Sequence, residues 1–371
     1  MMQETPGRKF KVCLVSISLA KGGAERSCAM LSRMLTGLGH EVHLVLLTDA
    51  VDFEYAGKLF NLGLQKKENE NNIKRFFRLK KLRKYLLKEK FDFIIDHRPK
   101  NDISRELFYH KYIYKDQPRI YVTHSARADN YLTVHPEKFV KIANKNRLNV
   151  AVSRHIENEL LKKSGISNTA TVHNAYDPQW AEDGGTIPEF LTGKKYILYY
   201  GRIDDGVKDL MFLIRAFTFS KLWREDIYLV LLGEGKDKEG LKEFCSHEPS
   251  KDFIRFEDFT ANPFAIIKNA LFTTLTSKYE GFPMVLTESL SLGTPIVSLD
   301  IVSGPSEVIQ SRQNGLLVPE RSIPLFSDAM REMALDKKLR TYCETNAKSS
   351  VKAFSMDSIA LKWDNFLQHA T

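Results

Sequence analysis

The chain has 371 residues, more than a single hydrophobic core usually supports, so two domains are expected. Its hydrophobic and charged fractions, 43% and 27%, are those of an ordinary soluble globular protein, and we find neither a secretory leader nor an apolar run of about 18 residues. The net charge of +9 points to an anionic partner, while four scattered cysteines without metal-ligand spacing favour a reduced, cytoplasmic protein.

Short β-branched runs alternate with amphipathic helical stretches through the first half of the chain. Strands are predicted at 11–18, 41–47, 91–96, 120–124 and 148–153. Helices are predicted within 22–40, after a glycine loop, and over 72–90 and 155–165. Such alternation is typical of parallel βαβ units with right-handed crossovers, and it predicts a Rossmann-like sheet.

Residues 174–195 are rich in turn formers and lack periodicity, which predicts an interdomain linker. The alternation then restarts, with strands predicted at 195–201, 227–233, 253–259, 271–277 and 294–300. The helices predicted beyond the linker lie at about 207–222, 236–246, 262–270, 284–292 and 356–370. We therefore expect an α/β protein with two doubly wound parallel sheets: an N-terminal domain of 1–185, a C-terminal domain of 186–355, and a terminal helix, 356–371, that packs back on the first domain.

Ligands of parallel sheets bind at the carboxyl ends of the strands, which for two such domains predicts a site in a cleft between them. The loop after the strand 271–277 carries Glu280, and Pro283 stands where the first helical residue is expected. The free N–H groups of 283–285 and the helix dipole would form a diphosphate site. Glu280 would then accept hydrogen bonds from sugar hydroxyls, and Glu288 would reach ribose hydroxyls. The alternative is a capped helix with two solvated glutamates.

This segment resembles the signature of two glutamates separated by seven residues in family-4 retaining glycosyltransferases of the GT-B fold. Further blocks carry the resemblance: Ala270-Leu271, Leu292-Gly293-Thr294-Pro295-Ile296-Val297, Gly304-Pro305 with Glu307, and Asn314-Gly315-Leu316-Leu317-Val318. The resemblance implies a nucleotide-sugar donor, a UDP-sugar, whose hexose or N-acetylhexosamine passes to a glycan acceptor. The donor-binding residues that it implies here are Gly281, Phe282, Pro283, Met284, Val285 and Glu288.

Two cations follow the strand 195–201: Arg202 at its carboxyl end and Lys208 at the start of the next helix. Cations at this place can share the charge that develops on a departing diphosphate. The family has an arginine and a lysine at the matching positions, which implies catalytic roles for Arg202, Lys208 and Glu280. A glycine commonly follows that lysine, whereas this chain has Asp209. The alternative is an arginine and a lysine on a solvated loop.

Glycines and an aromatic residue provide further candidates for donor contacts. In the family, a glycine-rich loop at the position of Gly22 and Gly23 lets the backbone approach the donor phosphate and the acceptor. The loop lacks the GxGxxG pattern of dinucleotide-binding proteins, and the alternative is a turn that needs only conformational freedom. Phe259 and the turn Gly233-Glu234-Gly235 lie where the family packs the nucleotide base.

His124 ends the predicted strand 120–124. The family often has a histidine after this strand, in contact with the transferred sugar near its anomeric centre, which implies a catalytic role for His124. His97, His135 and His173 are the other candidates, and a lone histidine with a structural role is the alternative.

The sequence offers no convincing pair of carboxylates for acid/base and nucleophilic roles. Asp204-Asp205 resembles a metal-binding DxD motif but lies in a cationic loop, and no His/Asp cluster has metal spacing. We therefore expect transfer without a metal or other cofactor, with Arg202, Lys208 and the helix N-terminus at 283–285 stabilising the leaving diphosphate. The family implies attack of the acceptor hydroxyl on the same face of the sugar, with a phosphate oxygen as the base.

Residues 65–90 contain eleven Lys/Arg against three Glu, which is nearly the whole excess of positive charge. Apolar residues interleave these cations at helical spacing: Ile73, Phe76, Phe77, Leu79, Leu82, Leu86 and Leu87. One interpretation is a core-packed helix with a solvated cationic face. The other is a surface, 66–90, that holds the protein on anionic lipid at the inner face of the cell membrane.

Relatives that glycosylate lipid-linked acceptors at the cytoplasmic leaflet have such surfaces, which implies an undecaprenyl-diphosphate-oligosaccharide or another glycolipid as acceptor. Nucleic acid is not expected as a partner, because the aromatic residues of the segment sit at core-like spacing and no RNA-binding module is visible. Two other functions stay open: a nucleotide-sugar epimerase of the same fold, which would turn over donor without acceptor, and a non-catalytic binder of sugar nucleotides.

Overall fold

The computed structural model describes residues 7–66, 70–181 and 185–370. The chain divides into two compact units. Unit 1 comprises residues up to Ala175 together with Met356 onwards, and unit 2 comprises Tyr176–Ser355. The chain therefore passes from unit 1 to unit 2 earlier than the boundary expected at residue 185.

Unit 1 contains a seven-stranded sheet in the order β3-β2-β1-β4-β5-β6-β7, and every neighbouring pair is parallel. Its strands are β1 Lys11–Ser16, β2 Glu41–Leu46, β3 Lys58–Asn61, β4 Phe93–Asp96, β5 Arg119–Thr123, β6 Leu148–Ala151 and β7 Thr169–Thr171. The two edge strands, β3 and β7, were not predicted. Both are short and only partly buried, so neither shows the apolar run that identifies the inner strands.

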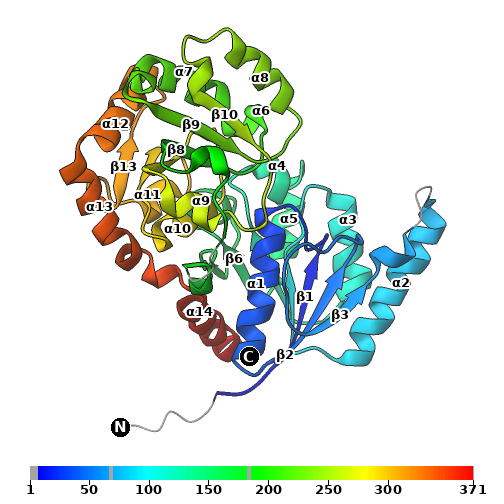
Figure 1. Ribbon diagram of the computed structural model, residues 1–371. Helices are drawn as coiled ribbons and strands as arrows, with labels where there is room; N and C mark the ends of the chain where they lie inside the picture. The colour runs from blue at the N-terminus through cyan, green and yellow to red at the C-terminus, as the bar shows by residue number, and fades with distance from the viewer. Residues whose placement is uncertain (1–6, 67–69, 182–184, 371) are drawn as a thin grey trace, which may run out of the picture. The chain divides into compact units, whose positions relative to one another are not determined.

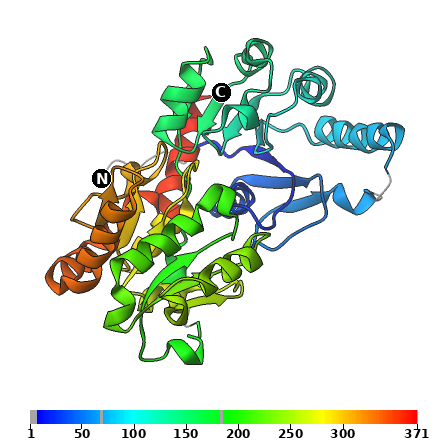
Figure 2. The ribbon, with the colours of Figure 1, turned by 90° about the horizontal axis from the view of Figure 1, so that it is seen from above.

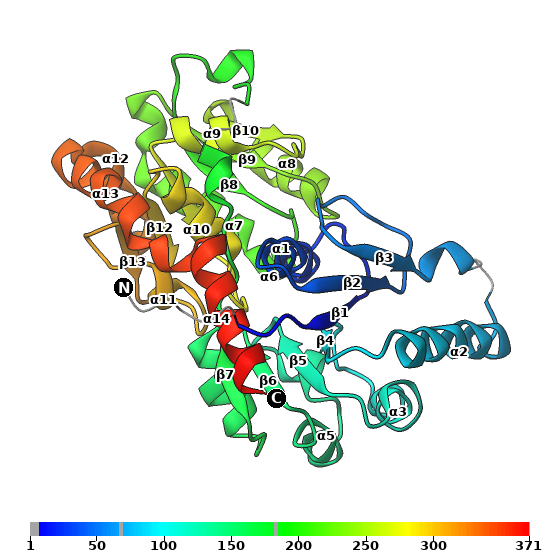
Figure 3. The same ribbon diagram turned by 90° about the horizontal axis from the view of Figure 1, so that it is seen from below.

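Helices cover both sides of this sheet: Figure 3 shows α1 and α14 on one side and α2, α3 and α5 on the other. The helices of unit 1 are α1 Gly23–Gly37, η1 Gly63–Gln65, α2 Asn72–Glu89, α3 Ile103–Phe108, η2 Tyr109–Tyr114, α4 Ala128–Tyr131, α5 Pro136–Ala143, η3 Ile156–Lys162 and α14 Met356–His369. The terminal helix α14 packs against α1, and the imidazole of His40 just beyond α1 contacts the Asp364 carboxylate at 3.0 Å. Thus the C-terminal residues close the core of the unit that begins the chain.

Helix α2 carries the basic segment and lies at the rim of unit 1 (Figure 1, Figure 2). Leu79, Leu82 and Leu86 are buried, whereas several other apolar residues of the segment are exposed: Ile73, Phe76, Phe77 and Leu87. The expected helix is therefore confirmed, but it is packed through only part of its apolar residues. None of the described helices is long and apolar enough to cross a membrane.

Unit 2 contains a six-stranded parallel sheet in the order β10-β9-β8-β11-β12-β13. Its strands are β8 Lys195–Tyr200, β9 Ile227–Leu232, β10 Ile254–Glu257, β11 Phe272–Leu275, β12 Ile296–Leu299 and β13 Gly315–Val318. Side chains alternate between the two faces of a strand. On β8, Ile197 and Tyr199 join the core that includes α7 and α12, while Leu198 and Tyr200 join the core that includes α9.

The helices of unit 2 surround this sheet (Figure 1). They are η4 Pro178–Ala181, η5 Glu189–Leu191, α6 Asp205–Lys208, α7 Leu210–Ser220, η6 Leu222–Glu225, α8 Lys238–Ser246, η7 Lys251–Phe253, α9 Phe264–Asn269, α10 Met284–Ser291, α11 Pro305–Val308, α12 Ile323–Leu335, α13 Lys337–Ser350 and η8 Lys352–Phe354. The single helix predicted over 207–222 is wrong: two helices, α6 and α7, meet at Asp209, whose φ of 53° breaks the helical path.

Candidate functional site

The side chains of Lys208 and Glu280 meet at the carboxyl edge of the sheet in unit 2. The Lys208 ammonium forms an ion pair with Glu280 Oε1, and both side chains are mostly buried, at 17% and 15% exposed. Ser277 Oγ donates to the same carboxylate oxygen at 2.7 Å. The backbone is also fixed, because Thr276 Oγ1 donates to the Lys208 carbonyl at 2.9 Å. The loops after β8 and β11 thus hold a paired cation and carboxylate side by side.

Arg202 does not join this pair. Its side chain is 64% exposed, and its Nε lies 3.9 Å from Asp204 Oδ2, at the limit of an ion pair. The backbone of Arg202 is nevertheless fixed, since its carbonyl accepts a hydrogen bond of 2.7 Å from the Tyr199 hydroxyl. The structure therefore separates the two cations that the sequence grouped: Lys208 is engaged with Glu280, and the Arg202 side chain extends into solvent.

Asp209 stands where the family commonly has glycine, and its backbone explains that preference. Its φ and ψ, both 53°, are left-handed, a conformation that aspartate adopts more easily than most side chains. The carboxylate is held by Arg321, at 2.5 Å, and faces Lys278 at 3.8 Å. Asp209 therefore adopts the turn that glycine would adopt after Lys208. Its carboxylate adds two contacts with cations that a glycine could not make.

The helix α10 begins beside Glu280. Pro283 is the residue preceding the helix, not its first residue as expected, and having no N–H it contributes no donor. The Leu286 N–H donates to the Pro283 carbonyl at 3.1 Å, whereas those of Met284 and Val285 donate to no backbone carbonyl within the described residues. The anion-binding donors of this helix end are therefore the amides of Met284 and Val285.

A second loop supports this helix start. Ser303 Oγ donates to the Gly281 carbonyl at 2.6 Å. Gly304 has a φ of 103°, and a Cβ there would lie 2.4 Å from the Pro283 ring, so only glycine fits without displacing the loop. The Gly304-Pro305 block is thus a packing partner of the segment that carries Glu280.

Three other residues predicted to bind the donor are buried: Phe282, Met284 and Glu288. Glu288 is only 2% exposed, so the interpretation of a solvated glutamate is wrong for this position. The Phe282 ring packs against that of Phe354, with 5.4 Å between centroids, and Met284 is also buried. In this segment the backbone and the Glu280 side chain therefore remain available to a ligand, while the buried side chains of Phe282 and Met284 anchor the segment to the core.

The loops after β8 and β9 approach each other backbone to backbone. Gly233 has a φ of 150°, and a Cβ there would lie 1.9 Å from the Gly201 carbonyl oxygen. Beyond β10 the Phe259 ring is 69% exposed. A cavity of about 440 Å³ opens at this edge of the sheet, lined by residues that include Leu232, Glu257, Asp258 and Thr260. Its lining is acidic, which favours an uncharged ring over a phosphate.

Gly22 and Gly23 lie where α1 of unit 1 begins. Gly22 has an extended φ of −126°, and neither glycine is among the residues with positive φ. A Cβ on Gly23 would meet no atom within 4 Å. The interpretation of a turn that needs only conformational freedom is therefore wrong for these positions. The structure leaves open space at Gly23, beside the first amides of a fifteen-residue helix.

His124 follows β5, and it pairs with His97, which follows the neighbouring strand β4. The two rings are stacked with centroids 5.1 Å apart, and His97 Nδ1 lies 3.0 Å from His124 Nε2. Burial lowers the pKa of His97 to about 3, and burial together with His97 and Lys100 lowers the pKa of His124 well below its ordinary value. Both imidazoles are therefore neutral at pH 7.

In a pair of neutral imidazoles one ring donates and the other accepts. The outer atoms, His97 Nε2 and His124 Nδ1, are buried and have no hydrogen-bond partner among the described residues. One of these atoms is then a donor and the other an acceptor, and unsatisfied buried polar atoms cost folding energy. The arrangement is typical of a site completed by a ligand.

A buried ionic cluster, which was not predicted from the sequence, holds the loop that carries His97. Arg98 Nη2 lies 2.7 Å from Asp96 Oδ2 and 3.4 Å from Glu106 Oε2, and Lys100 Nζ lies 3.2 Å from Asp96 Oδ1. All four side chains are at most 2% exposed. The signal was present in Asp96-His97-Arg98-Pro99-Lys100 directly after a buried strand, where charges need partners.

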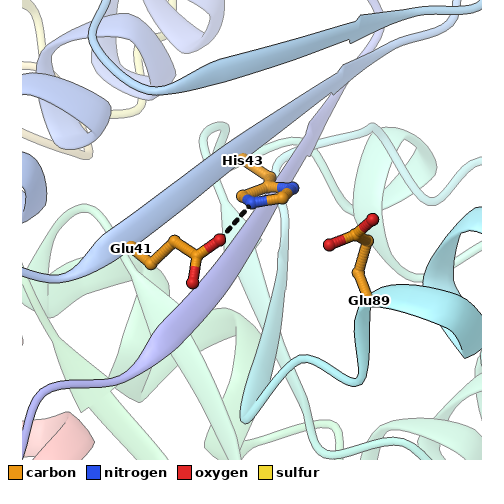
Figure 4. A group of neighbouring side chains, drawn as sticks. All are labelled: Glu41, His43 and Glu89. Carbon is orange, nitrogen blue, oxygen red and sulfur yellow. Dashed lines mark hydrogen bonds and ion pairs between the residues drawn. The ribbon is translucent and has the colours of Figure 1, made fainter.

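Contrary to the expectation from spacing, the fold also brings together a group of metal-ligand type: Glu41, His43 and Glu89 (Figure 4). It lies away from the carboxyl strand ends, since Glu41 begins β2 and Glu89 ends α2. Lys11 Nζ already lies 2.7 Å from Glu89 and 3.2 Å from Glu41. The His43 nitrogens contact the Tyr85 hydroxyl and the Glu41 carboxylate. A metal ion would have to displace these partners.

Both units of the chain match models of known protein families. Residues 21–180 match the family model described as Glycosyltransferase Family 4, and residues 187–350 match the one described as Glycosyl transferases group 1. The chain belongs to the family-4 type glycosyltransferases. The enzyme is 27% identical, over 94% of its length and 97% of the relative's, to N-acetylgalactosamine-N,N'-diacetylbacillosaminyl-diphospho-undecaprenol 4-alpha-N-acetylgalactosaminyltransferase of Campylobacter jejuni. It is 30% identical to lipopolysaccharide 1,6-galactosyltransferase of Escherichia coli, over 48% of its length and 49% of the relative's.

Solved structures confirm the expected GT-B fold of this glycosyltransferase. Anabaena Alr3699/HepE in complex with UDP-glucose superposes with a TM-score of 0.78 at 16% identity, over 97% of this chain and 100% of that one. A TarM mutant of S. aureus in complex with UDP and other ligands superposes with a TM-score of 0.76 at 14% identity, over 96% of this chain and 99% of that one. At such identities the likeness concerns the fold alone.

Proposed function

We propose that this glycosyltransferase moves a hexose or N-acetylhexosamine from a UDP-sugar to a lipid-linked saccharide or another glycan. The donor proposal is supported by the UDP and UDP-glucose in the complexes of similarly folded proteins. The acceptor proposal is supported by the name of the C. jejuni relative, which describes a saccharide linked to undecaprenol through a diphosphate. Membership of a transferase family favours transfer over epimerisation and over binding without catalysis.

The observation that carries the donor proposal is the Lys208–Glu280 pair beside the start of α10. The amides of Met284 and Val285 and the ammonium of Lys208 supply donors for a diphosphate. Glu280 balances the charge of Lys208 in the absence of donor and accepts hydrogen bonds from sugar hydroxyls. The uncharged base of the nucleotide would occupy the acidic cavity near Leu232 and Thr260.

The proposed chemistry is a metal-independent transfer with retention of configuration. The bond between the anomeric carbon and the diphosphate oxygen breaks while the acceptor oxygen bonds to the same face of the carbon. The acceptor proton passes to the departing phosphate oxygen, which serves as base. Lys208 and the helix N-terminus stabilise the charge that leaves with the diphosphate, and Arg202, exposed in this structure, is proposed to turn toward it.

His124 is proposed to hydrogen-bond a hydroxyl of the sugar undergoing transfer through its outer atom, Nδ1. His97 would set which tautomer His124 presents, because the nitrogens facing each other share a single hydrogen. The low pKa values keep both rings uncharged, so the pair offers a hydrogen bond without repelling a developing positive charge on the sugar.

A nucleotide titration tests the donor proposal. UDP and UDP-sugars are expected to raise the melting temperature of the wild-type protein more than GDP and GDP-sugars do. Lys208→Ala should lose this stabilisation, because the diphosphate loses a charged partner. Lys236→Ala is the matched control, since that lysine is 71% exposed and lies on the neighbouring loop. Equal stabilisation of both variants by UDP would contradict the proposed site.

We also propose that α2 holds the enzyme on anionic membrane lipid. The support is the coexistence of exposed apolar side chains, including Ile73 and Phe77, with a run of cations. Flotation with phosphatidylglycerol vesicles should weaken in Ile73→Ala/Phe77→Ala but not in the control Leu361→Ala, which removes an exposed leucine of α14. Equal flotation with neutral and anionic vesicles would contradict the idea.

A further inference from the structure

A second basic feature of unit 1 is a cavity of about 470 Å³. It is lined by residues around η2 and the starts of two strands: His110, Lys111, Lys115, Asp116, Gln117, Pro118, Arg119, Lys145 and Arg147. Five of these carry positive charge and one carries negative charge. Arg119 begins β5 and Arg147 directly precedes β6, so the cavity opens at the amino edge of the sheet. His97 and His124 lie at the opposite, carboxyl edge.

Arg119 is the buried and rigid member of this lining, at 3% exposed. Its Nε donates to Asn146 Oδ1 at 3.1 Å and its Nη1 donates to the Lys115 carbonyl at 2.9 Å. Asn146 is itself fixed, because its amide nitrogen donates to Asn149 Oδ1 at 2.9 Å. The remaining terminal nitrogen, Nη2, donates to no group in the described part of the chain. The guanidinium is thus held in place while both N–H groups of Nη2 remain available to a ligand.

Three of the four surrounding cations lack an anionic partner among the described residues. Within residues 7–66, 70–181 and 185–370, Lys111, Lys145 and Arg147 form no ion pair, and Lys115 meets only Asp116, at 3.8 Å. Burial lowers the pKa of His110, and the positive charges of Arg119, Lys145 and Lys111 lower it further. The His110 ring is therefore neutral, and its buried Nδ1 has no hydrogen-bond partner among these residues. Such like charges repel one another unless an anion occupies the space between them.

We propose that this cavity binds a phosphate group. A fixed guanidinium matches the oxygens of a phosphate, and flexible lysines add charge-assisted donors around it. The lining contains no Phe, Tyr or Trp on which a nucleic-acid base could stack. The phosphate comes either from a soluble phosphate or diphosphate or from the headgroup of an anionic lipid. The site is separate from the proposed donor site and does not depend on the proposed transferase activity.

Calorimetric titration with inorganic phosphate and pyrophosphate tests the proposal. The titrations use Lys208→Ala protein, so that the diphosphate site proposed in unit 2 does not contribute. In this background, Lys111→Ala/Lys145→Ala/Arg147→Ala should raise the Kd for pyrophosphate at least about tenfold, because three charge-assisted donors are lost. The control Lys138→Ala/Lys141→Ala/Lys338→Ala removes three exposed cations elsewhere and should leave the Kd unchanged.

Vesicle flotation distinguishes the two sources of the phosphate. If the site holds a lipid headgroup, the cavity variant should float less with phosphatidylglycerol vesicles than the control variant, and pyrophosphate should compete. If the ligand is soluble, both variants should float alike while their Kd values for pyrophosphate differ. Equal pyrophosphate affinity of the two variants, or no binding of pyrophosphate or vesicles that depends on the cavity, would overturn the proposal.

Discussion

At the residue scale, the fold does not require glycine at position 23, so a substitution of Gly23 tests whether the position has a functional role. Its φ is not positive and a Cβ would meet open space, so Gly23→Ala should change the free energy of unfolding by no more than about 1 kcal/mol. If the donor phosphate approaches this backbone, the added methyl group should raise the donor KM several-fold. Thermal melts and steady-state kinetics check the two parts, and an unchanged KM would argue that the space at Gly23 is not used.

His97 gives a prediction about pH at the same scale. Its pKa in the folded protein, about 3, is below its ordinary value of about 6.5. Below pH 6.5 the His97 imidazole binds a proton in the unfolded chain but not in the folded chain. The contribution of His97 to the free energy of unfolding is therefore fully present above pH 6.5 and falls as the pH drops toward 3. Lowering the pH from 8 to 5 should therefore reduce the free energy of unfolding by about 2 kcal/mol through this group.

The variant His97→Asn should therefore show a smaller loss of stability between pH 8 and pH 5 than the wild type. Denaturant titrations at several pH values measure how the free energy of unfolding of each protein depends on pH. Because the carboxylates titrate alike in both proteins, the difference between the two pH dependences reports on His97. Parallel slopes would mean that the imidazole is not held in its neutral form.

At the scale of elements, the sequence predicted what depends on local chemistry. The start of α10 could be placed to within a residue, since a proline before an apolar helical stretch has few alternatives. The inner strands were equally readable because both faces are buried. Edge strands β3, β7 and β13, and the break between α6 and α7, were missed, because they depend on pairing partners or on one left-handed residue that no periodicity reveals.

Asp209 is that residue, and it allows a test of the break. In Asp209→Gly the left-handed backbone becomes unstrained while the contacts with Arg321 and Lys278 are lost, so stability should stay within about 1 kcal/mol of the wild type. Asp209→Ala loses the same contacts but keeps the strain, and should be less stable than the glycine variant by about 1 kcal/mol. Equal melting temperatures of the two variants would show that the backbone at 209 is not held left-handed.

At the scale of the whole molecule, the alternation of strands and helices predicted two Rossmann-like sheets, and both are present. What could not be predicted is which distant residues meet. Lys208 and Glu280 are joined because α6 and the loop after β11 sit at one sheet edge, and Arg202, grouped with them in the sequence, remains exposed. The pairing of His97 with His124 likewise depends on β4 and β5 being neighbours, which only the fold determines.

The decisive measurement for the proposed activity is transfer of sugar from a UDP-sugar to an extracted lipid-linked glycan acceptor. The wild type and Lys236→Ala should form product at similar rates. Lys208→Ala and Glu280→Ala should be slower by at least about a hundredfold while still unfolding cooperatively in thermal melts, since each removes a group that stabilises or orients the reacting donor. Wild-type rates in both site variants, or donor turnover that needs no acceptor, would contradict the assignment.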